Sequence, residues 1–150
     1  MKKILVPIDG SEYSDKALVK AKELAGAFDS QVVLLNVMND ASTISSLHYA
    51  SINNIINLPD LKEEAKKKSN SVLEEAKKTF SDISVPVETV SLDEPTGNIA
   101  RAIADYANDY NPDVIVMGSN GIGSLKQRLY LGSVTTRVLH IVHKPVLVVQ

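Results

Sequence analysis

Hydrophobic residues follow two alternating patterns along the chain: short unbroken runs, and longer stretches with the spacing of one helix face. The runs Lys3–Ile8, Gln31–Val37 and Val114–Met117 are rich in β-branched residues, which is typical of strands buried on both sides. Between the first two runs, the apolar residues from Ala17 to Phe28 recur at the spacing of an amphipathic helix. A helix that joins two buried strands predicts parallel pairing with a right-handed crossover.

The N-terminus of this first helix has two candidate caps. Ser11 and Ser14 both precede the apolar residues of the helix, and either hydroxyl can accept a hydrogen bond from an N–H group of the first turn. The sequence does not choose between them.

The middle of the chain continues the alternation of strand and helix. A helix is expected to open at Pro59-Asp60, with an apolar face that extends to Phe80. Val85–Val90 alternates and carries a proline, which predicts a third strand near an edge of the sheet. The connection Asn39–Leu58 is polar and rich in Asn and Ser. A connection of this length in a compact domain is usually functional or partly disordered.

The last third of the chain predicts two helices and two strands. Thr96 is expected to cap a helix that stops near Asn108. A short helix over Ser133–Val142 is followed by a fifth strand, Val146–Val149. Its inward side is expected to consist of Val134, Val138, Leu139 and Val142. Five strands that alternate with four helices predict an open α/β sheet with helices on both faces.

Composition narrows the class of protein. The length of 150 residues predicts one domain over residues 1–150. The net charge of −2 argues against a nucleic-acid partner held by counterion release, and the lack of cysteine excludes disulfides and thiolate metal sites. No apolar run approaches the length of a membrane span. We therefore expect a soluble, cytoplasmic protein without a membrane partner.

The stretch after the fourth strand is the main candidate for a binding site. Gly118, Gly121 and Gly123 permit close approach of the backbone, and Gly132-Ser133 opens a new helix. Unpaired N–H groups at a helix start attract anions, and the helix dipole favours negative charge. The spacing is neither that of the dinucleotide fingerprint nor that of a P-loop. Tight turns and a helix cap are the structural alternative.

Asp9 is the second candidate, because it follows the first buried strand. In an open parallel sheet, ligands bind beyond the carboxyl ends of the strands. There, a carboxylate can contact a ribose hydroxyl or a metal ion, or it can simply bond to amides of its own turn. Lys126 and Arg128 add positive charge on the loop that follows the glycines. An anionic ligand would be attracted to these two positively charged side chains.

Taken together, these motifs resemble the universal stress protein family. The similarity runs from ILVPIDGSE through VVLLNV to VIVMGSNGIGSLKQRLYLGSVTTRVL and HKPVLVV, and leaves out only Asn39–Leu58. The ATP-binding branch carries G-x2-G-x9-G-[ST], whose fixed residues match Gly118, Gly121 and Gly132-Ser133. Ten residues, Ile122–Leu131, stand where the pattern has nine. The extra residue bears on where the last helix begins relative to bound phosphates.

The resemblance implies a fold and a ligand. The fold is a single-domain open five-stranded parallel sheet in the order 3-2-1-4-5, and the ligand is ATP or another adenine nucleotide with Mg²⁺ or Mn²⁺. The resemblance names no protein ligand for the metal. It also implies a homodimer paired through Val146–Val149. The implied nucleotide contacts are Pro7, Ile8, Asp9 and the backbone of Val37 at adenine and ribose, Met117, Gly118, Ser119 and Gly121 at ribose and α-phosphate, and Gly132, Ser133, Val134 and Thr135 at the outer phosphates.

Three functions remain open from the sequence. The first is an ATP-binding regulator or sensor in a stress response, whose unidentified protein partners respond to nucleotide occupancy. The second is a family member that has lost nucleotide binding through the inserted residue and acts by protein–protein contacts. The third is an enzyme of the same fold that acts on an adenylated substrate. No known catalytic motif occurs, so no catalytic residue is named and at most slow ATP hydrolysis is expected.

Overall fold

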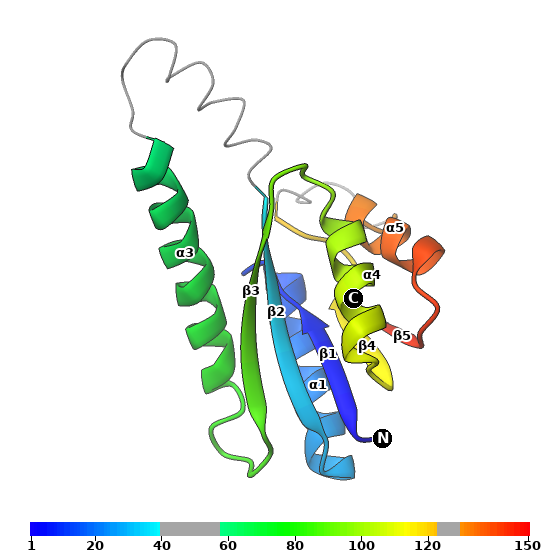
Figure 1. Ribbon diagram of the computed structural model, residues 1–150. Helices are drawn as coiled ribbons and strands as arrows, with labels where there is room; N and C mark the ends of the chain where they lie inside the picture. The colour runs from blue at the N-terminus through cyan, green and yellow to red at the C-terminus, as the bar shows by residue number, and fades with distance from the viewer. Residues whose placement is uncertain (40–57, 123–129) are drawn as a thin grey trace.

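A parallel sheet of five strands forms the centre of the computed structural model, which describes residues 1–39, 58–122 and 130–150 (Figure 1). The order of the strands is β3-β2-β1-β4-β5, which confirms the predicted order. The strands are β1 (Lys3–Pro7), β2 (Gln31–Asn39), β3 (Val87–Glu94), β4 (Val114–Gly118) and β5 (Val146–Val149). Gly123, Lys126 and Arg128 lie outside the described residues.

Helices cover both faces of the sheet, as predicted. Those of the described residues are α1 (Glu12–Phe28), α3 (Leu58–Lys78), α4 (Ile99–Tyr110) and α5 (Ser133–Ile141). The first two pack on one face and the last two on the other; in Figure 1, α4 lies in front of the sheet and α1 behind it. None of the described helices has the length and hydropathy needed to cross a membrane.

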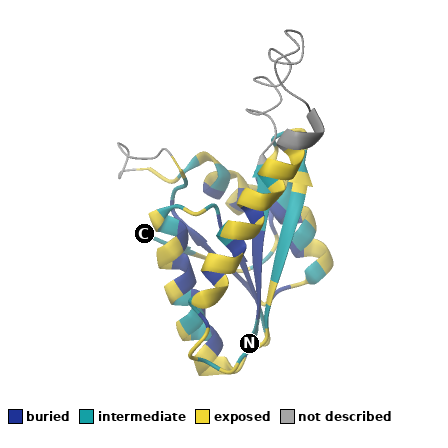
Figure 2. Cartoon of the chain, turned by 90° about the vertical axis from the view of Figure 1, so that its left-hand side faces the viewer, coloured by how far each residue is buried: buried dark blue, intermediate teal, exposed yellow. Residues whose placement is uncertain are grey.

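The central strands are largely apolar because they are buried on both sides. In β1, Ile4 and Val6 belong to the core under α1 and α3, whereas Leu5 belongs to the core under α4 and α5. All three side chains are fully buried. Figure 2 shows the same arrangement, with buried residues concentrated on the strands and exposed residues on the outer sides of the helices. Successive residues of a strand point to opposite faces, so a sheet covered twice has no polar face.

The helix caps decide one open choice and correct one prediction. Ser11 caps α1, since its hydroxyl accepts the N–H of Ser14 at 3.2 Å. The cap of α4 is Asn98, not Thr96, because the Asn98 side chain accepts the N–H of Arg101 at 3.2 Å. Gly97, with a φ of 75°, turns the chain between the two residues, and the Thr96 hydroxyl bonds instead to the carboxylate of Glu94.

Other boundaries also differ from the predictions. The helix α4 continues past Asn108 to Tyr110, and α3 begins at Leu58. The third strand starts at Val87, after the proline, and lies at the sheet edge as predicted.

The predicted inward side of α5 is wrong at one position. Leu139 is 39% exposed, whereas Thr135, Val138 and Val142 are buried. These three lie three and four residues apart and therefore form one stripe of the helix. Leu139 follows Val138 directly, so it is rotated away from the core by about a quarter of a turn.

Candidate functional site

The sheet opens between β1 and β4, where the strand order reverses. Pairing between these strands covers only Ile4–Leu5 and Val114–Ile115. The N–H of Ile8 donates to the Leu35 carbonyl on the β2 side at 2.8 Å. Because backbone groups alternate sides along a strand, the nitrogen of Pro7 faces β4. Proline has no N–H to donate to the ladder, so the two strands separate at the point where open α/β sheets bind their ligands.

A hollow of about 100 Å³ lies in this opening. Its wall is mainly apolar, with a few convergent polar groups, which is the usual character of a small-molecule site. It is formed by Pro7, Ile8, Asp9, Ser14, Leu35, Val37, Ile99, Ile103, Met117, Gly118, Asn120, Val134 and Thr135. The volume is below the roughly 300–1,000 Å³ of whole small-molecule pockets. The hollow therefore suits one flat group, with the rest of a ligand outside it.

The carboxylate of Asp9 joins the first strand to the glycine turn at the rim of this hollow. One of its oxygens accepts the N–H of Ser11 at 2.9 Å, and the other accepts the N–H of Ile122 at 3.1 Å. Each carboxylate oxygen can accept more than one hydrogen bond. Asp9 thus forms the amide contacts of a turn residue and still has acceptor capacity for a ligand hydroxyl.

The glycines of the turn are required by close contacts. A Cβ atom on Gly121 would lie 2.6 Å from Oδ2 of Asp9. On Gly118 it would lie 2.8 Å from backbone atoms of Tyr13, where α1 begins. Real Cβ atoms do not approach other atoms this closely, so both positions need glycine for α1, Asp9 and the turn to meet.

The start of α5 is fixed to the end of β4. The N–H of Gly132 donates to the Ser119 carbonyl at 2.8 Å, and the hydroxyl of Thr135 donates to the Gly118 carbonyl at 2.9 Å. No side chain in the described part of the chain caps the helix. Among the described residues, the N–H groups of Ser133, Val134 and Thr135 have no acceptor, as is usual for a first turn.

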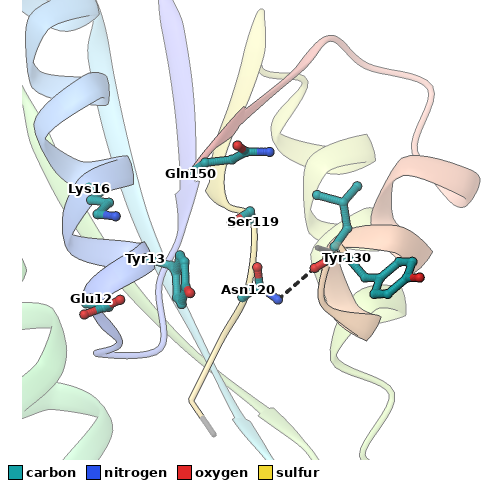
Figure 3. Close-up of a pocket in the computed structure, with 8 residues that line it drawn as sticks. Glu12, Tyr13, Lys16, Ser119, Asn120, Tyr130 and Gln150 are labelled. Atoms are coloured by element: carbon teal, nitrogen blue, oxygen red, sulfur yellow. Dashed lines mark hydrogen bonds between the residues drawn. The ribbon is translucent and has the colours of Figure 1, made fainter. Parts of the chain in front are cut away.

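A second hollow, of about 450 Å³, lies on the α1 side of the glycine turn (Figure 3). Tyr13 and Lys16 of α1 face Asn120 and Tyr130 across it, and Gln150 lies above them. The Asn120 side-chain amide donates to the Tyr130 carbonyl at 3.2 Å. Asn120 belongs to the walls of both hollows, so this residue separates them.

The predicted site residues divide into three groups. Those that line the first hollow are Pro7, Ile8, Asp9, Val37, Met117, Gly118, Val134 and Thr135. Gly121, Gly132 and Ser133 lie beyond it, in the turn and at the helix start. Ser119 lines the second hollow instead, and its backbone N–H is occupied by the Val149 carbonyl at 2.8 Å.

Sequence reasoning missed several residues of the first hollow. Ile99 and Ile103 lie one helical turn apart at the start of α4, and this spacing by itself indicates only the apolar face of a helix. Leu35 lies two residues before Val37 and shares its side of the strand. Asn120 is the residue of this group that the sequence could have indicated, because a polar residue between two glycines of a turn is well placed to hold that turn.

No metal site is preformed in the described part of the chain. No group of three or more His, Asp or Glu side chains is placed to hold an ion there. Among the described residues in the wall of the first hollow, Asp9 carries the only carboxylate. A cation that accompanied a nucleotide would therefore take most of its ligands from phosphate and water, which is the usual environment of Mg²⁺.

A doubly wound α/β sheet that opens at its point of strand reversal belongs to the class of folds that bind nucleotides there. A model of the universal stress protein family matches residues 1–150. The universal stress protein YxiE of Bacillus subtilis (strain 168) is 34% identical over 153 aligned residues, which cover 99% of this chain and 98% of YxiE. The chain belongs to the universal stress protein family.

Solved structures agree with this assignment. The structure of MJ0577, a universal stress protein of Methanocaldococcus jannaschii, superposes with a TM-score of 0.80 at 31% identity, over 99% of this chain and 94% of that one. A universal stress protein of Archaeoglobus fulgidus in complex with dAMP superposes with a TM-score of 0.64 at 20% identity, over 100% and 98% of the two chains. The second match shows a shared fold alone.

Proposed function

We propose that the chain binds an adenine nucleotide, in the first instance ATP with Mg²⁺ or Mn²⁺, and acts as a nucleotide-dependent regulator in a stress response. The observation that carries this proposal is the apolar hollow between β1 and β4, with a carboxylate at its rim and an uncapped helix start beside it. A flat base, a ribose and phosphates require these three environments side by side.

Each part of the nucleotide has a matching set of groups. The base enters the apolar hollow and meets the backbone of Val37. Asp9 accepts a ribose hydroxyl with the acceptor capacity that the two amides leave. The phosphates lie along the turn Gly118–Gly121 and against the N–H groups at the start of α5, which carry the positive end of the helix dipole. The complex of a family member with dAMP supports the choice of adenine.

Hydrogen bonds hold the start of α5 next to the end of β4, although the family pattern has one residue fewer in this loop. Ile122–Leu131 holds ten residues, but hydrogen bonds flank the insertion: Asn120 contacts the Tyr130 carbonyl, and Gly132 contacts the Ser119 carbonyl. The extra residue lies between these contacts, and loops accommodate insertions well. This observation favours nucleotide binding over the alternative in which the insertion has abolished it.

The proposal includes a homodimer through β5. Within residues 1–39, 58–122 and 130–150, Val146–Val149 pairs only with β4 and forms one edge of the sheet. Leu147 of this strand is 36% exposed, and Leu139 and Ile141 of α5 are 39% and 38% exposed. An apolar strand whose outer edge is unpaired is prone to pair with another chain. Pairing with a second copy would cover it.

Calorimetric titration with ATP and Mg²⁺ tests the nucleotide site, together with thermal melting. We expect binding, and a stabilisation of about 2.7 kcal/mol when ATP is at 100 times its Kd. Gly121→Ala should weaken binding, since its Cβ would lie 2.6 Å from Asp9 Oδ2. The matched control is Gly26→Ala, whose Cβ has no atom within 4 Å. Absence of binding heat and of any shift in melting temperature would refute the proposal.

Two further measurements separate the remaining alternatives. Mass spectrometry of the ligand that copurifies with the protein identifies the nucleotide. Multiple turnovers of an adenylated substrate, abolished by Asp9→Ala in a folded protein, would instead establish an enzyme. Stoichiometric binding without turnover fits the regulator.

A further inference from the structure

The ladder between β1 and β2 ends with a side chain in place of a backbone group. The N–H of Ile8 donates to the Leu35 carbonyl at 2.8 Å. In a regular parallel ladder, the Ile8 carbonyl would next accept the N–H of Val37. Instead it accepts the side-chain amide of Asn36, with an Nδ2···O distance of 2.8 Å. Asn36 therefore ends the backbone pairing one hydrogen bond early.

The consequence falls on Val37. Its N–H and C=O point to the same side of the strand as those of Leu35, which is the side of β1. Among the described residues, no backbone acceptor is recorded for the Val37 N–H. Val37 also lines the apolar hollow. The N–H donor and the C=O acceptor of Val37 therefore both face the opening of the sheet.

A partly buried chain of polar side chains fixes the orientation of Asn36. The hydroxyl of Ser69, on α3, donates to Oδ1 of Asn36 at 2.7 Å. The same hydroxyl lies 2.7 Å from that of Ser91, the cross-strand partner of Asn36. Ser69 is 3% exposed, and its single proton is used for Asn36, so Ser91 donates to Ser69. With Oδ1 held in this way, Nδ2 is the atom that faces Ile8.

We propose that Asn36 is a positioning residue for recognition of the nucleobase: it occupies the Ile8 carbonyl and so keeps the backbone of Val37 available to the ligand. This inference rests on the proposed function. The adenine edge carries an acceptor, N1, beside a donor, the 6-amino group, and it complements an N–H beside a C=O. Hypoxanthine carries a donor at N1 and an acceptor at position 6, so the same backbone pair disfavours it. A site with fixed polar groups rejects a base that leaves them unpaired.

The first test is made without ligand, by amide hydrogen exchange of Val37 measured by NMR. Asn36→Asp keeps the shape of the side chain and its contact with Ser69, but an ionised carboxylate cannot donate to the Ile8 carbonyl. We expect the Val37 N–H to pair with that carbonyl and to exchange at least about tenfold more slowly than in the wild type. Equal exchange in both proteins would overturn the proposal. Asn36→Leu, which also lacks the donor, replaces this variant if the carboxylate prevents folding.

The second test compares the affinities for ATP and for inosine triphosphate. The wild type should prefer ATP, and Asn36→Asp should lose about tenfold in ATP affinity, as expected for one hydrogen bond of roughly 1.4 kcal/mol, while inosine triphosphate affinity changes little. The matched control is Ser91→Ala, which removes the outer hydrogen bond of the same chain but leaves Ser69 bonded to Asn36 and the Asn36 amide bonded to the Ile8 carbonyl. It should lower the melting temperature and keep the preference.

The outcomes are distinguishable. If the variants weaken both nucleotides equally, Asn36 is only a structural link between α3 and the sheet, and the proposal fails. If the wild type binds neither nucleotide, the proposed function fails together with the role of Asn36 in base recognition. The exchange rate of Val37 still decides in that case whether Asn36 controls the backbone pairing.

Discussion

Two aspartates at opposite ends of the sheet make the same kind of contact in different surroundings. At the carboxyl end, Asp9 accepts the N–H groups of Ser11 and Ile122 at 2.9 and 3.1 Å. At the amino end, Asp113 accepts the N–H groups of Lys2 and Lys3 at 2.6 and 2.9 Å. Each carboxylate links the β1 side of the sheet to the β4 side.

The difference lies in what surrounds the carboxylate. Next to Asp113, the ammonium of Lys3 bonds to the Tyr110 carbonyl at 3.3 Å and lies 4.9 Å from the centre of the Tyr110 ring. The ring of Tyr106 stacks on Tyr110 at 5.9 Å. Asp9 instead borders an apolar hollow. A carboxylate that joins two strands is therefore no sign of a ligand by itself; the opening beside it, caused by Pro7, is the feature that distinguishes the two ends.

The largest effect is expected at Gly118, where the carboxyl end of the sheet has no space for a side chain. Gly118→Ala would place a methyl group 2.8 Å from backbone atoms of Tyr13. Backbone cannot turn aside as a flexible side chain does, so we expect a loss of about 1–3 kcal/mol in the free energy of unfolding, measured by urea denaturation. Gly26→Ala, inside α1 with no atom within 4 Å of its Cβ, should gain about 0.5–1 kcal/mol. A Gly118→Ala protein as stable as the wild type would contradict the contact.

Replacing each aspartate by asparagine tests the comparison directly. Asp9→Asn should lower ATP affinity by about 10- to 150-fold, because a hydrogen bond to a charged group contributes roughly 1.5–3 kcal/mol. Asp113→Asn should leave the affinity unchanged, since that residue lies at the other end of the sheet. Calorimetry measures both. Equal losses in the two variants would show that the carboxylates act only through the stability of the sheet.

Asp113 should contribute to the pH dependence of stability in acid. The backbone N–H groups of Lys2 and Lys3 lower the pKa of this carboxyl below its ordinary value. Its contribution to stability is therefore complete above the unfolded value of about 3.9 and is lost as the pH falls through the folded pKa. The melting temperatures of the wild type and Asp113→Asn should converge in acid. A difference that stays constant from neutral to acidic pH would contradict this.

The sequence predicted the sheet better than it predicted the contacts between elements. The apolar runs of β1 and β2 follow from burial on both sides, a property that each segment shows alone. Asn36 and Ser69 are 33 residues apart, and no local pattern indicates that they meet. Thr96 was a reasonable cap, but the left-handed turn at Gly97 moved the helix start to Asn98.

The sequence indicates part of the site directly, at Pro7 and at the glycines of the turn. Pro7 was expected only to line a nucleotide, although a proline at the end of a central strand also predicts that the strand loses its neighbour there. Gly118 and Gly121 were correctly expected to permit close approach. The partners of these glycines, Tyr13 and Asp9, became visible only once α1 and the turn were placed against each other.

The smallest effect is expected at the amino end, from Tyr110→Phe. The Tyr110 hydroxyl is buried and has no partner among the described residues. Burial, followed by the negative charge of Glu88, raises the pKa of Tyr110 to about 12. Because the folded pKa is raised, its contribution to stability is complete below the ordinary value of about 10 and is lost as the pH rises through the folded pKa.

At neutral pH the phenylalanine variant should be as stable as the wild type or slightly more stable, since it removes a buried hydroxyl that makes no hydrogen bond. Above about pH 10 its advantage should grow, because only the wild type must then lose a proton to unfold. Melting curves at neutral and alkaline pH measure both effects, and ATP affinity should not change. If Tyr110→Phe instead weakened ATP binding, the amino end would communicate with the hollow beside Asp9, and the division of the sheet into a closed end and an open end would be wrong.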